Sequence, residues 1–145
     1  MESAKIGDWI ITKNNQLIAF NKPAGIAVQP DGTKDKSLLE LAEIYTKKKL
    51  FLVHRIDRPA SGVVIFAKTD KAAKQLSAQF KDRKIKKVYL AIVREEPPTT
   101  AGTLTHYLKK ITRLNKSIAL ETPEKEAKES ILQYSVIAKS QYYQL

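Results

Sequence analysis

The chain has 145 residues, with 26 Lys and Arg against 15 Asp and Glu, so its formal net charge is +11. A chain of this length forms one domain of ordinary size and buries about two thirds of the surface that its unfolded form exposes. It contains no Cys, which excludes a disulfide scaffold, a cysteine nucleophile and a thiolate metal site. No apolar run approaches the roughly 20 residues of a membrane span, and the N-terminus has no signal-peptide pattern. We therefore expect a cytoplasmic protein with no membrane partner.

The positive charge is concentrated in three clusters, at 47–49, 81–87 and 109–116. Nucleic acid is the commonest polyanionic partner of such clusters, because its phosphates attract Lys and Arg whatever the base sequence. The alternative for any one cluster is a solvated helix end. Three clusters in so short a chain favour nucleic-acid contact.

Apolar spacing in the first half predicts strands and one helix. Ser37 is a suitable N-cap for that helix, and Lys47–Lys49 follows its last turn, where cations suit the negative end of the helix dipole. The expected elements are strands at Trp9–Thr12 and Leu17–Phe20 joined by a turn at Asn14–Asn15, an extended piece at Ile26–Val28, and a helix over Leu38–Tyr45.

In the second half, Val63–Ala67 is apolar on both faces, which is typical of a strand in the middle of a sheet. Asp70 is expected to cap a second helix with Ala73, Leu76 and Phe80 on its apolar side. The remaining expected elements are strands at Val88–Val93, Leu104–Leu108 and Leu132–Ala138, and one that begins at Tyr142. The sequence thus predicts a mixture of the two element types, with more strand than helix.

Most catalytic classes find no support in the sequence. Two His and no Cys offer no ligand cluster for a metal, and there is no His-Glu-x-x-His pattern. The five Gly are scattered, so no phosphate-binding loop is visible, and no Gly-x-Ser-x-Gly is present.

The segment His54–Gly62 remains, because it gathers several functional groups directly before the expected buried strand. Asp57 stands between Arg55 and Arg58, and neighbouring cations keep a carboxylate ionised and available as a nucleophile or base. The alternative is that Asp57 only organises a turn before Pro59. On composition alone, the alternative is favoured.

Three motifs resemble those of the RluA-type pseudouridine synthases. The segment His54-Arg55-Ile56-Asp57-Arg58-Pro59-Ala60-Ser61-Gly62, with Ala67-Lys68-Thr69 after it, is similar to the catalytic motif of that family. Upstream, Asn21–Gly25 resembles the first motif, and downstream Lys87–Val93 resembles the tyrosine-bearing motif. The order and spacing of the three motifs make the resemblance specific.

This resemblance implies an isomerase that cuts the glycosidic bond of a uridine in rRNA or tRNA, turns the uracil and rejoins it through carbon, with no cofactor and no metal. Asp57 matches the essential aspartate, which acts on the ribose as nucleophile or base. The target nucleotide must leave the helical stack to reach it. Arg55 matches the arginine that fills the vacated space, a task suited to a planar charged group.

The resemblance also implies roles for other residues. Tyr89 matches the tyrosine that packs on the base, although without the family an ordinary core tyrosine is the simpler interpretation. Lys22 and Pro23 are expected to shape the pocket wall, and the alternative for Lys22 is a surface lysine. His54 and Arg58 are expected to contact the substrate. The RNA backbone is expected to follow the basic residues Lys81, Arg83, Lys84, Lys86 and Lys87.

The family pattern is incomplete here. Its late motif, Gly-Arg-x-His-Gln-Ile/Leu-Arg, supplies a basic partner to the aspartate, and no Gly-Arg occurs in this chain. The resemblance therefore implies an α+β fold with a mixed, mostly antiparallel sheet and flanking helices, incomplete at its C-terminal end, and a single catalytic domain over 1–145. We expect a monomer with little turnover by itself, in which an exposed sheet edge permits self-association. The rival hypothesis is a non-catalytic RNA-binding or assembly protein on the same fold.

Overall fold

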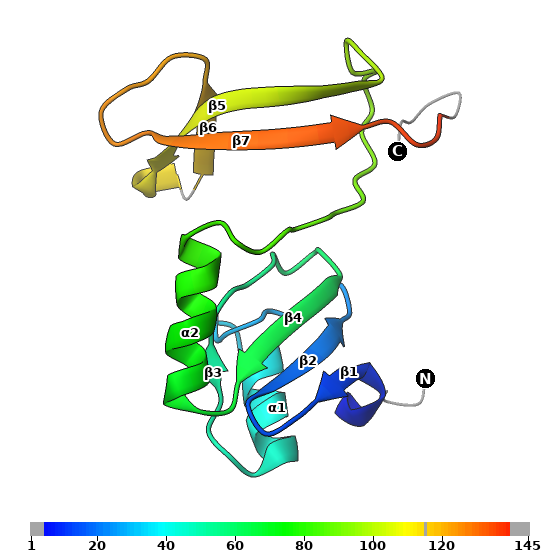
Figure 1. Ribbon diagram of the computed structural model, residues 1–145, viewed down its shortest axis with the longest axis vertical. Coiled ribbons are helices and arrows are strands. Elements are labelled where there is room, and N and C mark those ends of the chain that lie inside the picture. The colour runs from blue at the N-terminus through cyan, green and yellow to red at the C-terminus, as the bar shows by residue number, and fades with distance from the viewer. Residues whose placement is uncertain (1–4, 115, 140–145) are drawn as a thin grey trace. The chain divides into compact units, whose positions relative to one another are not determined.

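The computed structural model describes residues 5–114 and 116–139 (Figure 1). Its backbone contacts divide the chain into two compact units, Met1–Lys87 and Val88–Leu145, and each is described by itself. The single catalytic domain expected over 1–145 stays a prediction, because a domain can contain more than one compact unit. No helix in the described part of the chain is both long and apolar enough to cross a bilayer.

The first unit is built on a four-stranded antiparallel sheet in the order β1-β2-β4-β3. Its strands are β1 (Ile10–Lys13), β2 (Leu17–Lys22), β3 (Phe51–Leu52) and β4 (Gly62–Ala67), and the short 3₁₀ helix η1 (Ile6–Trp9) precedes them. The side-chain oxygen of Asn14 accepts from the backbone N–H groups of Gln16 and Leu17 and so closes the expected turn. β4 lies between two strands, as its two apolar faces predict.

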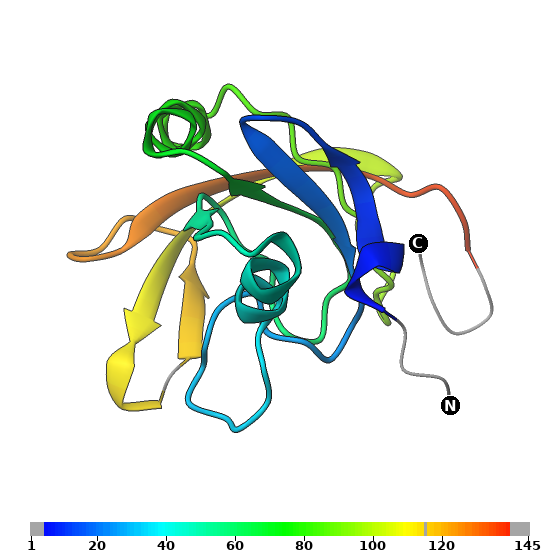
Figure 2. The ribbon, with the colours of Figure 1, turned by 90° about the horizontal axis from the view of Figure 1, so that it is seen from below.

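Helix α1 (Leu38–Thr46) begins where the sequence predicts. The Ser37 hydroxyl accepts from the N–H of Glu40, and the Glu40 carboxylate accepts from the N–H of Ser37, which is a capping box. Leu38 and Ala42 are buried in one core cluster with Phe20 and other residues of β2 and β4. Figure 2 shows α1 and α2 on opposite faces of this sheet.

Helix α2 (Asp70–Lys81) begins one residue differently from the prediction. The N-cap is Thr69, whose hydroxyl accepts from the N–H of Ala72 at 3.2 Å, and Asp70 is the first helical residue. The reason is that both residue types favour N-caps, and here Thr69 is the one with extended backbone. The helix ends at Lys81, and Arg83, two residues beyond, has a left-handed backbone with φ 54°.

Two predicted extended segments are not strands. Ile26–Val28 is a loop whose carbonyls at Ala27 and Val28 accept from the first N–H groups of α1. Val88–Val93 has no strand partner in the described residues apart from a bridge at Val93, and Val88 is 77% exposed. The strand predicted at Val88–Val93 is wrong because an apolar run indicates burial only. It does not provide the neighbouring strand with which the segment would have to pair.

The second unit contains a three-stranded antiparallel sheet in the order β6-β5-β7. Its strands are β5 (Ala101–Ile111), β6 (Lys116–Leu120) and β7 (Lys128–Ser135), and the short 3₁₀ helix η2 (Thr112–Leu114) connects β5 to β6. β5 extends the predicted strand at both ends, β7 covers only the first part of the predicted one, and β6 was not predicted. The strand expected from Tyr142 lies outside the described residues. Every described strand pair is antiparallel, and the predicted α+β class is confirmed.

Candidate active site

The segment that carries Asp57 begins where β3 separates from β4. Pairing between β3 and β4 ends at Leu52, which lies opposite Phe66. The N–H of Ile65 in β4 therefore has no backbone acceptor on β3. The imidazole Nε2 of His54 accepts this hydrogen bond at 3.0 Å. The same ring stacks on Phe80 of α2, with 4.6 Å between ring centroids. His54 therefore anchors the segment to both the sheet and the helix.

Burial lowers the pKa of His54 below its ordinary value of 6.5, and the positive charge of Lys87 lowers the pKa further. A neutral imidazole is required here, because Nε2 accepts a hydrogen bond and cannot then carry a proton. The remaining proton is on Nδ1. These contacts give His54 an anchoring role, and its expected contact with substrate stays a prediction.

Asp57 itself is exposed and lines an open pocket of about 250 Å³. Its backbone carbonyl accepts from the N–H of Ala60 at 3.1 Å, which closes a turn around Pro59. The turn-forming interpretation is therefore right for the main chain of Asp57, and the same residue also lines the pocket. The pocket is lined by Ala27, Val28, Gln29, Pro30, Asp31, Arg55, Ile56, Asp57 and Arg58.

The two arginines beside Asp57 are placed differently. Arg55 is exposed and lines the same pocket. Arg58 forms ion pairs with Asp31 and Asp35. Neither arginine forms an ion pair with Asp57 in residues 5–114 and 116–139. The cause is the turn, which directs the Arg58 side chain toward the loop of residues 25–35.

Lys22 is fully buried at the end of β2, and the surface-lysine alternative is wrong. Its Nζ donates to the carbonyl oxygens of Pro23 at 2.9 Å, Ile26 at 2.7 Å and Arg58 at 3.2 Å. An ammonium has three donors, and all three are used, so a buried charge is tolerated here. Burial lowers the pKa of Lys22. Neither Lys22 nor Pro23 lines the pocket, but Lys22 donates to the carbonyl oxygen of Arg58, a residue that does.

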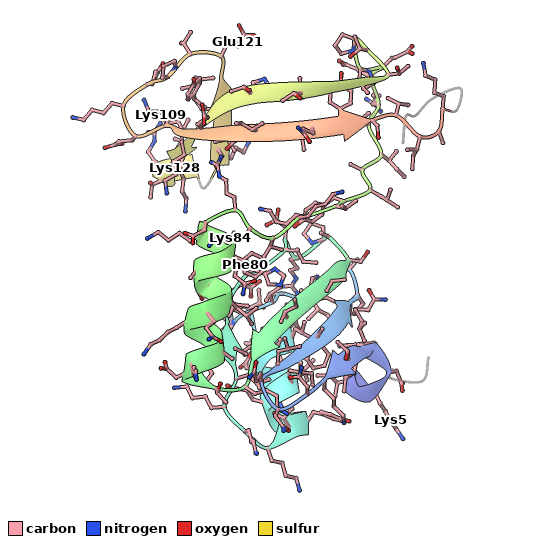
Figure 3. The ribbon with its side chains drawn as sticks, viewed as in Figure 1. Lys5, Phe80, Lys84, Lys109, Glu121 and Lys128 are labelled. Atoms are coloured by element: carbon pink, nitrogen blue, oxygen red, sulfur yellow. The ribbon has the colours of Figure 1, made fainter. Side chains whose placement is uncertain are left out.

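The basic stretch after α2 is exposed next to this segment. Lys81, Arg83, Lys84, Lys86 and Lys87 all have exposed side chains. Phe80, which stacks on His54, and Lys84 lie at the same end of α2 (Figure 3). The proximity of Lys87 to His54 places the end of the stretch there as well. Positive charge is thus gathered near His54, at the end of α2 that carries Phe80.

Tyr89 belongs to the second unit. It is 64% exposed in the segment that follows the basic stretch, so the core-tyrosine alternative is wrong. Its expected place on the base stays a prediction.

Sequence reasoning missed the loop that forms the other wall of the pocket. Gln29, Pro30 and Asp31 line it, and the run Asp31-Gly32-Thr33 carries only a turn signal. The contacts of this loop with Arg58 cross 23 to 33 positions of the chain, and no local pattern encodes such a pairing. Within the described residues, no three acidic or His side chains are grouped to hold a metal ion.

Comparison with known proteins bears on this site. The family described as RNA pseudouridylate synthase matches residues 16–145. The chain is 34% identical to tRNA pseudouridine synthase C of Haemophilus ducreyi over 133 residues, which are 90% of this chain and 54% of the relative. It is 33% identical to ribosomal large subunit pseudouridine synthase C of Buchnera aphidicola over 135 residues, 91% of this chain and 42% of the relative.

A solved structure gives the same fold. Human RNA Pseudouridylate Synthase Domain Containing 4 superposes with a TM-score of 0.76 at 23% identity, over 96% of this chain and 57% of that one. The chain thus spans about half the length of the curated relatives it matches.

Proposed function

The chain belongs to the RNA pseudouridylate synthase family, and from this we propose that it converts uridine in structured RNA to pseudouridine, with Asp57 as the reacting carboxylate. The observation that carries the proposal is the open carboxylate of Asp57. Asp57 is exposed, lines a pocket and forms no ion pair among the described residues.

In the proposed reaction, the bond between N1 of uracil and C1′ of the ribose breaks, the base turns, and a bond from C5 to C1′ forms. C5 loses its hydrogen and N1 gains one, so atoms and charge balance and the product is an isomer. Asp57 acts on the sugar as nucleophile or base. Because the uridine must first leave the stack, at a cost of a few kcal/mol, we assign Arg55 at the pocket to the vacated space and Tyr89 to the base.

The proposed substrate is tRNA or rRNA, since relatives of this chain are named for one or the other. The basic residues 81–87 hold its phosphates without reading sequence. Folded RNA shape then selects the uridine.

Asp57→Asn tests this proposal, because it keeps the size of the side chain and removes its charge. In the full-length protein, pseudouridine formation should fall by at least about a thousandfold, the scale on which removal of a reacting group acts, while RNA retention stays within twofold of the parent. Asp70→Asn, an exposed aspartate on α2, is the matched control and should keep full activity.

Unchanged formation in Asp57→Asn would remove the carboxylate from the mechanism. A parent protein that retains RNA but forms no pseudouridine on any tRNA or rRNA from cells lacking the gene would instead favour the non-catalytic RNA-binding protein.

A further inference from the structure

The guanidinium of Arg58 holds a loop that lies across the pocket from the backbone of Arg58. Nε donates to the carbonyl oxygen of Gly25 at 2.9 Å. One terminal nitrogen donates to the carboxylate of Asp31 and the hydroxyl of Thr33, both at 3.2 Å, and the other donates to the carboxylate of Asp35 at 2.6 Å. Four residues of the loop therefore meet on the three nitrogens of one planar group.

The loop is shaped to present these acceptors. The carboxylate of Asp31 accepts from the N–H of Thr33 at 3.2 Å and from its hydroxyl at 2.7 Å. These bonds, and then the charge of Arg58, lower the pKa of Asp31, so the group is ionised at neutral pH. Gly32 between them has φ +86°, a left-handed conformation that glycine adopts without strain.

The main chain of Arg58 is bound to the same loop. The N–H of Gly25 donates to the carbonyl oxygen of Arg58 at 2.8 Å, and Nζ of Lys22 donates to the same oxygen. Arg58 is thus fixed at both ends, its backbone beside Asp57 and its guanidinium in the loop.

The pocket has two walls, residues 27–31 from the loop and residues 55–58 from the segment that carries Asp57. Among the described residues, the direct side-chain hydrogen bond between these two walls joins Arg58 to Asp31, and Arg58 also holds Gly25, Thr33 and Asp35 of the same loop. Lys22 adds an indirect link, because it donates to the carbonyl oxygens of Ile26 and Arg58. We propose that Arg58, held by Asp31 and Asp35, is a positioning residue that fixes the spacing of the two walls and thereby the presentation of Asp57 to the nucleotide. This inference rests on the proposed function of the pocket.

The resemblance had suggested that Arg58 contacts the substrate. A phosphate at Arg58 would have to displace two carboxylates, and its donors would leave the loop. Lys is a poor substitute in this position, because a single ammonium cannot reach three points with the geometry of a planar fork. We call the hydrogen bonds of Arg58 with Gly25, Asp31, Thr33 and Asp35 the clamp. A substrate contact at Arg58 and the clamp predict different kinetics.

Trypsin cleavage within the loop can measure how often the loop opens. Lys34 and Lys36 are exposed trypsin sites inside it. In Arg58→Gln of the full-length protein, cleavage at these two lysines should be at least about fivefold faster, because local opening limits cleavage of a held loop. Asp35→Asn should give the same direction of change, and since the Asp35 side chain is 75% exposed, this variant tests the clamp even if Arg58→Gln folds poorly.

Lys74→Gln is the matched control. It breaks the exposed ion pair between Lys74 and Asp70 on α2 and should leave cleavage at Lys34 and Lys36 unchanged. Unchanged cleavage in both Arg58→Gln and Asp35→Asn overturns the clamp.

Kinetics then separate positioning from RNA contact. A displaced reacting group lowers kcat, by about tenfold to a hundredfold for a shift of an ångström, so Arg58→Gln should lower kcat with the KM for RNA within twofold. Arg58→Lys should recover only a small part of the loss. The double variant Arg58→Gln/Asp35→Asn should be no worse than Arg58→Gln alone, because both act on one contact.

A raised KM with unchanged kcat would place RNA on Arg58 and overturn the proposal. Protease cleavage does not depend on activity. If Asp57→Asn remains active, the proposed function fails while the cleavage pattern still reports whether the clamp exists.

Discussion

Nζ of Lys22 lies 3.2 Å from the carbonyl oxygen of Arg58, although 36 positions separate the two residues. One buried ammonium therefore joins the end of β2 to the turn that follows Asp57. The same ammonium also holds the carbonyls of Pro23 and Ile26.

Lys22→Met keeps the length and apolar stem of the side chain and removes these three donors. Three partly buried carbonyls then lose a partner, so we expect the free energy of unfolding to fall by roughly 2–4 kcal/mol. Trp9 is the only Trp and packs against the core of the first unit, so denaturant unfolding followed by its fluorescence measures this loss. Lys68→Met is the control: its Nζ donates to the Asn14 carbonyl at an exposed site, and it should cost less than about 1 kcal/mol.

His54 makes the stability of the first unit depend on pH. The pKa of His54 is lower in the folded protein than its ordinary 6.5, so the unfolded chain takes up a proton first as pH falls. The free energy of unfolding is then full above about pH 6.5 and decreases below it, with a slope of at most about 1.4 kcal/mol per pH unit. This window lies above the titration of ordinary carboxylates.

His54→Gln keeps a side-chain acceptor and cannot be protonated, so its free energy of unfolding should be flat between pH 7 and 5.5. His106→Gln, which removes the other histidine, should keep the slope of the parent. Trp9 fluorescence at a series of pH values measures both, and a parent with no slope in this window would show that His54 does not hold the neutral contact.

Arg83 separates stability from RNA binding. The N–H of Lys84 donates to the Gln79 carbonyl and that of Arg83 to the Phe80 carbonyl, a helix ending at which glycine is usual. Arg83→Gly relieves the positive φ and should stabilise α2 by up to about 1 kcal/mol, yet RNA affinity should fall because a phosphate contact is lost.

Lys47→Gly is its counterpart at the end of α1, where φ is 52°. It should also stabilise the protein, and RNA affinity should fall less than in Arg83→Gly, because Lys47 lies outside the proposed RNA path along 81–87. Thermal unfolding and filter binding measure the two effects. Equal losses of affinity in both variants would contradict an RNA path along 81–87.

The salt dependence of binding counts the phosphates on this path. Replacing Lys81 and Lys84 by Gln should make the slope of log affinity against log salt shallower by roughly one unit or more. Lys71→Gln/Lys74→Gln, at the opposite end of the same helix, should leave the slope unchanged. An unchanged slope in the first variant would move the RNA elsewhere.

The elements that the sequence predicted are those whose signals are local. Ser37 and Glu40 form their capping box within four residues, and the apolar run Val63–Ala67 predicted the strand β4, which lies between β2 and β3. The motif around Asp57 likewise located the pocket.

The features that escaped prediction depend on partners far along the chain. Burial of Lys22 is decided by carbonyls that only the fold brings together, and Arg58 meets Asp31 and Asp35 across more than twenty positions. Val88–Val93 shows the converse, since its apolar pattern predicts a strand for which the described residues provide no pairing beyond Val93.

The bond between Ile65 and His54 gives β4 two kinds of neighbour along one edge, backbone opposite Phe66 and an imidazole opposite Ile65. A side chain can release its partner by rotation about its own bonds, whereas a strand can do so only by separating as a whole. Amide hydrogen exchange at Ile65 should therefore be faster than at the residues of β4 paired with β3. Any evolutionary replacement of His54 must supply another acceptor, because otherwise the N–H of Ile65 loses its hydrogen bond at this edge of the sheet.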